Sequence, residues 1–225
     1  MVYCGMNPMY EIMENLRAGD HAALFYRSRV EQFSIIVPFI AIGLQRGERC
    51  LYIAEDNSPA LVIKELEKGG IDVKSAEKSG ALTIATKYET YLRHGIFEPA
   101  KMTEDLIHEV QESIRLGYTA FRAAGEMTWA LSLPFALAQL SDYEVRLHKD
   151  FPGQFAGLCQ YDERGFSERV IADMIRIHPI VVARGKLLQN RFHQCGVTTE
   201  TLLPELVTVD QVVNAGSGEP IAQAC

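Results

Sequence analysis

The sequence lacks the short patterns that mark most metal, nucleotide and hydrolase sites. It contains no glycine-rich phosphate loop (GxxxxGK[ST] or GxGxxG), no GxSxG nucleophile elbow and no HExxH helix. Its five cysteines are scattered and form no CxxC pair, which excludes a zinc ribbon or a disulfide framework. The closest pair of possible metal ligands is His193-x-Cys195, and two ligands in a polar tail do not make a site. The sequence therefore predicts no metal site, and it leaves any cofactor unknown.

Long hydrophobic runs and an excess of basic charge are also missing. No apolar run approaches the ~18–20 residues of a membrane span. The N-terminus lacks the basic start and apolar core of a signal peptide. With 22 Lys and Arg against 29 Asp and Glu, the net charge of -7 argues against direct binding to nucleic acid or to an anionic membrane. These absences predict a cytoplasmic protein.

What the sequence does contain is an alternation of short apolar runs and longer helical stretches. At 225 residues with 48% hydrophobic residues, the chain has room for one domain with extensions. Strands are predicted at residues 21–26, 50–54, 81–86, 118–124, 155–161 and 180–183, and helices at 31–45, 59–68, 101–116, 133–149 and 167–177. This order predicts an α/β fold with a mainly parallel sheet and helices on both of its faces.

The two ends of the chain differ from its centre. After Arg191 there is no Lys or Arg, whereas four acidic residues follow. We interpret residues 1–18 as an N-terminal arm, 19–192 as the folded core and 193–225 as a weakly structured acidic tail. Leu202–Val213 is the part of this tail that has the pattern of one short docking helix.

Ligands of parallel α/β sheets bind beyond the carboxyl ends of the strands, and this rule selects the candidate site residues. Arg122 lies within a predicted strand, and strand alternation places Glu126 on the same face, as its nearest candidate partner. The pair is either a structural ion pair or a polar anchor for a ligand. The other candidates at the carboxyl ends of the strands are Tyr26, Glu55, Tyr88, Trp129 and Tyr161. Tyr88, Trp129 and Tyr161 are predicted to form pocket walls.

Three further candidates are less easily placed. Cys159 shares the parity of Tyr161 and is either a small core residue or a thiol that faces a ligand or metal. His21 and His178 stand at the amino-terminal starts of strands, away from the expected crevice. They are predicted to pair with each other or with backbone carbonyls, although both are retained as candidate ligand-binding residues.

Several local strings resemble the MEDS family, the sensory domain of methanogen and methylotroph regulators. The matching strings, in order over about residues 10–192, are Gly19-Asp20-His21, Leu24-Phe25-Tyr26, Gly47-Glu48-Arg49-Cys50-Leu51-Tyr52-Ile53, Gly80-Ala81-Leu82, Arg122-Ala123-Ala124-Gly125-Glu126-Met127-Thr128-Trp129-Ala130, Tyr143-Glu144, Leu158-Cys159-Gln160-Tyr161-Asp162 and His178-Pro179. The resemblance implies a three-layer RecA-like fold that has lost its phosphate loop. It also implies sensing of small organic compounds such as hydrocarbon derivatives, and the assembly into homo-oligomers that is common among RecA-type proteins.

These observations favour a stand-alone sensor, not an enzyme, that binds a small organic ligand and signals to a transcription or kinase partner. One alternative is a degenerate nucleotide-binding enzyme in which Glu55, Asp56 and Glu126 hold Mg²⁺. The other is an interaction adaptor whose crevice is filled by its own side chains.

Overall fold

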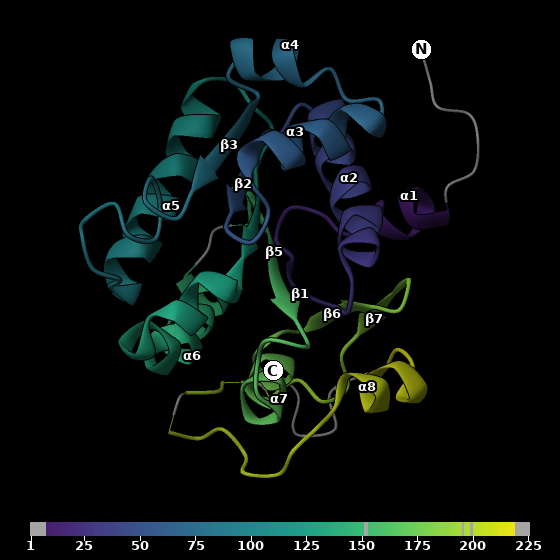
Figure 1. The fold of residues 1–225 in the computed structure, drawn as a ribbon, viewed down its shortest axis with the longest axis vertical. Coiled ribbons are helices and arrows are strands. Elements are labelled where there is room, and N and C mark those ends of the chain that lie inside the picture. Colours follow the sequence, from purple (N-terminus) through teal and green to yellow (C-terminus); the bar gives the residue numbers. More distant parts are fainter. Residues whose placement is uncertain (1–7, 151–152, 195, 199, 219–225) are drawn as a thin grey trace.

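A computed structural model shows a seven-stranded sheet between two layers of helices (Figure 1). It describes residues 8–150, 153–194, 196–198 and 200–218. The strand order is β3-β2-β4-β5-β1-β6-β7, and every neighbouring pair is parallel except β6 and β7. The predicted α/β class and mainly parallel sheet are confirmed.

The elements follow the predicted order closely. The strands are β1 (His21–Tyr26), β2 (Arg49–Ala54), β3 (Leu82–Thr86), β4 (Phe121–Glu126), β5 (Phe155–Asp162), β6 (Ile180–Ala183) and β7 (Lys186–Gln189). The helices are α1 (Pro8–Met13), α2 (Arg29–Gln45), α3 (Pro59–Lys68), α4 (Val73–Lys78), α5 (Pro99–Arg115), the 3-10 helix η1 (Met127–Ser132), α6 (Pro134–Asp150), α7 (Glu168–Ile177) and α8 (Val209–Ala215).

Local capping explains where several helices begin. The side chains of Ser28, Ser58 and Ser167 accept hydrogen bonds from the backbone N–H groups three residues further on. Pro59 occupies the first turn of α3, where its missing N–H costs no hydrogen bond. The short elements α4 and β7 were not predicted, because six and four residues give too little periodicity to read.

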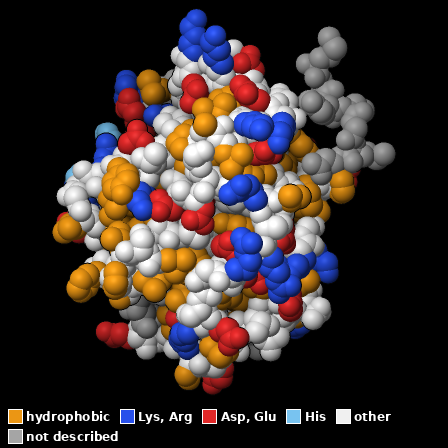
Figure 2. Space-filling view, viewed as in Figure 1, with side chains coloured by type: hydrophobic (Ala, Val, Ile, Leu, Met, Phe, Trp, Pro, Cys, Tyr) orange, Lys and Arg blue, Asp and Glu red, His pale blue; other side chains and the backbone are white. Residues whose placement is uncertain are grey.

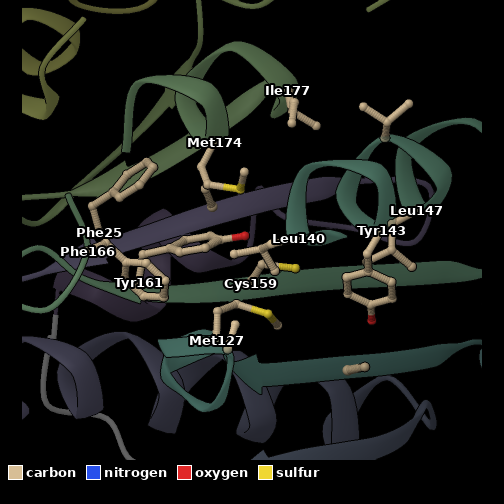
Figure 3. Close-up of a cluster of buried hydrophobic side chains, with 14 of the residues drawn as sticks. Phe25, Met127, Leu140, Tyr143, Leu147, Cys159, Tyr161, Phe166, Met174 and Ile177 are labelled. Atoms are coloured by element: carbon tan, nitrogen blue, oxygen red, sulfur yellow. The ribbon is translucent and has the colours of Figure 1, made fainter. Parts of the chain in front are cut away.

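The sheet separates two hydrophobic cores because successive side chains of a strand point to opposite faces. One core lies under α1 to α4 and includes Leu24 and Tyr52. The other lies under α5, α6 and α7 and includes Phe25 and Cys159. We call these the α2 face and the α6 face. Figure 3 shows Cys159 and Tyr161 on β5 among the side chains of the α6 face.

The C-terminal segment corrects the prediction of a weakly structured tail. Val207, Val209 and Val212 are buried against the core of the α6 face, and a capping box at Thr208 starts α8. Asp210 forms ion pairs with Arg27 and Arg184. Acidic and apolar side chains together therefore dock this segment, and the predicted short helix is present at a later position.

Candidate functional site

The buried Arg122 pairs with Glu48 and not with Glu126. Its guanidinium makes a hydrogen-bonded ion pair with the Glu48 carboxylate, and both side chains are buried on the α2 face. Glu126 lies four residues further along β4, near the opposite end of the strand. The predicted Arg122–Glu126 pair is therefore wrong, because Glu48, which precedes β2, lies beside the guanidinium. This pair ties β4 to the turn that precedes β2.

Glu126 instead anchors a hydrogen-bond network at the carboxyl edge of the sheet. Its Oε1 accepts from Tyr52 Oη at 2.5 Å and from Asn57 Nδ2 at 2.6 Å. Its Oε2 accepts from the backbone N–H groups of Glu55 and Asn57 at 2.8 and 3.1 Å. Burial, with the nearby Glu126 charge, raises the pKa of Tyr52 and of Tyr26. Four donors occupy this carboxylate, which leaves it poorly suited to hold Mg²⁺.

The predicted aromatic walls do not lie around one pocket. Trp129 is fully buried and stacks on Tyr91 with ring centroids 4.5 Å apart. Tyr161 is buried on the α6 face, opposite to Arg122 and Glu126, whereas Tyr88 is 70% exposed. The prediction that these candidates surround a single crevice is therefore wrong. Strand alternation places them on opposite faces of the sheet, and Tyr88 lies on the surface.

The turn where a phosphate loop would lie is closed by the chain itself. A Glu31 carboxylate oxygen accepts the backbone N–H of Arg27 at 2.8 Å, and Ser28 caps the helix that follows. A phosphate needs such backbone N–H groups to be free at a helix N-terminus. Glu55 is paired with Lys87 at 2.6 Å. These residues do not fit a nucleoside triphosphate and its metal.

A second buried glutamate, Glu144 on α6, brings together three of the predicted candidates. Its Oε2 lies 3.2 Å from His21 Nε2, 3.4 Å from His178 Nε2 and 3.3 Å from Cys159 Sγ. The Cys159 thiol is 3.5 Å from His21 Nε2, and all four side chains are buried. The imidazole rings of His21 and His178 are neighbours, with ring centroids 4.3 Å apart.

Two outer contacts orient this cluster. Tyr161 donates its hydroxyl hydrogen to Glu144 Oε1 at 2.5 Å, so that Oε2 is turned toward the histidines. His178 Nδ1 is 2.7 Å from the Met174 carbonyl, which only accepts and so requires the Nδ1 hydrogen. Figure 3 labels Tyr161, Cys159 and Met174, which belong to the same buried cluster on the α6 face.

Burial and the neighbouring charges set the protonation states in this cluster. Burial, and then the proximity of His178, lowers the pKa of His21 to about 4. Burial and the Glu144 charge raise the pKa of the Cys159 thiol. Burial alone would raise the pKa of Glu144, but the adjacent His178 and His21 nitrogens outweigh it and lower that pKa.

A cavity of about 190 Å³ lies between the sheet and α5, again on the α6 face. We call it the α5 cavity. Its apolar side chains come from β2, β3, β4 and α5, and its charged side chains stand around them, where Arg49 pairs with Glu109 at 2.8 Å. It is lined by Arg49, Leu51, Thr83, Ala85, Glu89, Thr90, Arg93, Met102, Asp105, Leu106, Glu109 and Phe121.

Sequence reasoning missed Glu48, Glu144 and the residues of the α5 cavity as site residues. Glu48 and Glu144 occur in the strings that carry the family resemblance. Their burial is known only from the structure, since Glu48 lies among polar residues in the turn before β2. The lining of the α5 cavity comes from segments that are far apart in the sequence, so no local pattern indicates it. Cys195, Cys4 and Cys225 lie outside the described residues.

The sheet order, the two helical layers and the closed phosphate-loop turn define a RecA-like α/β domain without a phosphate loop. The fold is shared with solved structures of low sequence identity. The uncharacterized protein PH0321 from Pyrococcus horikoshii, crystallised with an unknown peptide, matches with a TM-score of 0.59 and 15% identity, over 79% of this chain and 87% of that one. The KaiC-like protein PH0186 from the same organism matches with a TM-score of 0.53 and 13% identity, over 74% and 72%.

The chain belongs to the MEDS family, the methanogen/methylotroph DcmR sensory domain, which matches residues 20–179. A curated relative is the transcriptional repressor DcmR of Methylorubrum extorquens, 27% identical over 161 residues. The match covers 71% of this chain and 58% of the length of the repressor. Within the described part of the chain, no helix is long and apolar enough to cross a membrane.

Proposed function

We propose that this chain is the sensory part of a regulator and binds a small, mainly apolar organic compound in the α5 cavity. The observation that supports this proposal is the cavity itself, in which an apolar floor is surrounded by charged side chains. Apolar walls with a few polar groups are typical of small-molecule sites. Membership of a sensory-domain family is consistent with it.

The position of the cavity suggests how binding would be transmitted. A ligand between the sheet and α5 contacts Leu51 and Ala85 on the strands and Met102 and Leu106 on the helix. Binding would favour the arrangement of α5 that closes on the ligand, a population shift that a partner can read. The regulatory partner and assembly into homo-oligomers belong to this proposal, as does the assignment of the chain as a sensor, not an enzyme.

A thermal-shift screen of small aliphatic, halogenated and methylated compounds tests the proposal. A binder raises the melting temperature by mass action. Ala85→Leu, which extends a buried side chain into the cavity, should abolish the shift while the variant stays folded. Arg93→Gln, which removes a charge at the rim, should weaken it.

Arg115→Gln is the matched control, since Arg115 is an exposed arginine on α5 that does not line the cavity. Its shift should equal that of the wild type. If no compound stabilises the wild type, or if Ala85→Leu responds as strongly as the wild type, a ligand site in this cavity is contradicted.

A further inference from the structure

We propose that His21, Glu144, Cys159 and His178 form a closed site for a divalent transition-metal ion of the zinc class. These four residues come from β1, α6, β5 and the turn after α7, and the site is separate from the α5 cavity. The inference does not depend on the proposed sensing of an organic compound.

The distances match the edges of a tetrahedron around one ion. Zinc bonds of ~2.0–2.3 Å to nitrogen, oxygen and sulfur in tetrahedral geometry place the ligand atoms roughly 3.3–3.7 Å apart. Four of the six ligand–ligand separations lie at 3.2, 3.3, 3.4 and 3.5 Å. The other two, from His178 Nε2 to His21 Nε2 and to Cys159 Sγ, are at most 4.8 Å. Three ligand atoms are therefore close to tetrahedral spacing, and an ion would draw His178 toward them.

The hydrogen bond between His178 and the Met174 carbonyl fixes which ring nitrogen of His178 faces the proposed ion. Since His178 Nδ1 carries the hydrogen that faces the Met174 carbonyl, Nε2 is the ring atom left to coordinate a metal ion. That Nε2 makes no hydrogen bond within the described part of the chain, although the side chain is fully buried. It points instead toward Glu144 Oε2, at 3.4 Å. A buried carboxylate beside this nitrogen is stabilised by a positive charge between them, which either a proton on His178 or a metal ion supplies.

Charge and ligand chemistry select the type of ion. A thiolate and a carboxylate together carry two negative charges, which a divalent ion balances, and two neutral imidazoles complete the set. Thiolate and imidazole favour Zn²⁺ and its first-row neighbours, whereas Mg²⁺ and Ca²⁺ require oxygen ligands. Four protein ligands leave no open position, as in structural zinc sites.

A cavity reaches one of the four proposed ligands from the surface. A cavity of about 170 Å³ is lined by the exposed Gln189 and the half-buried His148 at its outer side and by the buried His21 on its inner side. The cavity borders His21, whereas the other three ligands do not line it, so an ion that enters here needs the side chains around His21 to move apart. The imidazole of His148 lies 6.4 Å from that of His21, on this route.

Cobalt(II) is the probe that tests the site, because a cobalt–thiolate bond produces a charge-transfer absorption band. The full chain is stripped with a chelator under reducing conditions. Co²⁺ is then added both to the native protein and during refolding, and bound metal is counted by mass spectrometry. We expect one Co²⁺ per chain with the thiolate band, and displacement of the band by Zn²⁺.

Two cysteine variants form the matched comparison. Cys159→Ser should lose the band, whereas Cys50→Ser should keep it, because Cys50 is the other described cysteine and is buried on the α2 face. Circular dichroism checks that both variants fold. Tyr161→Phe keeps all four ligands and should weaken Co²⁺ affinity about 10–100-fold, as loss of an outer-shell contact does.

Absence of the band in the wild type after both treatments would overturn the proposal. So would an undiminished band in Cys159→Ser or loss of the band in Cys50→Ser. If Cys159→Ser fails to fold, Glu144→Gln decides, since it removes a charged ligand, and an undiminished Co²⁺ affinity there would overturn the proposal.

Discussion

The two buried glutamates of this protein, Glu126 and Glu144, have opposite surroundings on opposite faces of one sheet. Glu126 receives four hydrogen bonds, two on each oxygen, from donors that need an acceptor. Glu144 accepts from the Tyr161 hydroxyl on Oε1 and from the Cys159 thiol on Oε2, and Oε2 also faces two imidazole nitrogens. A buried carboxylate that accepts hydrogen bonds on every side stabilises the fold. A buried carboxylate that lies beside other metal-ligand atoms is suited to bind an ion.

Charged side chains on the surface of the molecule differ from the two buried glutamates because they are exposed to solvent. Acidic and basic side chains are intermingled over the face shown in Figure 2, with hydrophobic side chains between them. The ion pairs at Arg115 and Arg146 join helical neighbours and are exposed to solvent, so they contribute little to stability. The polar contacts that matter most are therefore those inside the two layers.

The largest effect is expected at Glu126. Glu126→Ala leaves the Tyr52 hydroxyl, the Asn57 amide and two backbone N–H groups without an acceptor, which should lower the free energy of unfolding by about 3–5 kcal/mol. Urea denaturation followed by circular dichroism measures this. Tyr52→Phe removes a single donor and serves as the graded control, at about 1–2 kcal/mol. A loss below that of Tyr52→Phe would show that the network does not stabilise the fold.

The second prediction compares how much zinc stabilises the wild type and variants of the two glutamate clusters. At a free zinc concentration about 100 times the dissociation constant, the wild type should gain about 2.7 kcal/mol in the free energy of unfolding. Tyr52→Phe should gain the same amount, since Tyr52 lies on the other face. Glu144→Gln should gain much less, because it loses one charged ligand. Equal gains in Glu144→Gln and the wild type, measured in parallel urea titrations, would contradict the assignment.

The smallest effect is expected for Glu144→Gln without metal. In the presence of a chelator, the amide oxygen still accepts from Tyr161, and the amide nitrogen can donate to a histidine lone pair. The free energy of unfolding should therefore change by about 1 kcal/mol or less. Thermal and urea unfolding in chelator measure it, with Glu144→Leu as the comparison that removes both contacts. A loss as large as that of Glu126→Ala would place the two glutamates in the same structural role.

Most of the fold could be predicted because it depends on local patterns. The alternation of apolar runs and amphipathic helices, and the Ser58-Pro59 and Ser167 helix starts, each lie within a few consecutive residues. The pairing of Arg122 could not be predicted in this way. Two acidic residues were available to it, and only the distance across the sheet decides between Glu48 and Glu126.

The sequence by itself determined the strand order along the chain, the faces on which Arg122 and Cys159 lie, and the loss of the phosphate loop, because each depends on residue spacing or on a continuous motif. Only the tertiary structure decided that His21, Glu144, Cys159 and His178 meet at one point. These residues are separated by up to 157 positions in the sequence. They meet because β5, β1 and β6 are neighbours in the sheet, and no local sequence pattern determines which strands are neighbours.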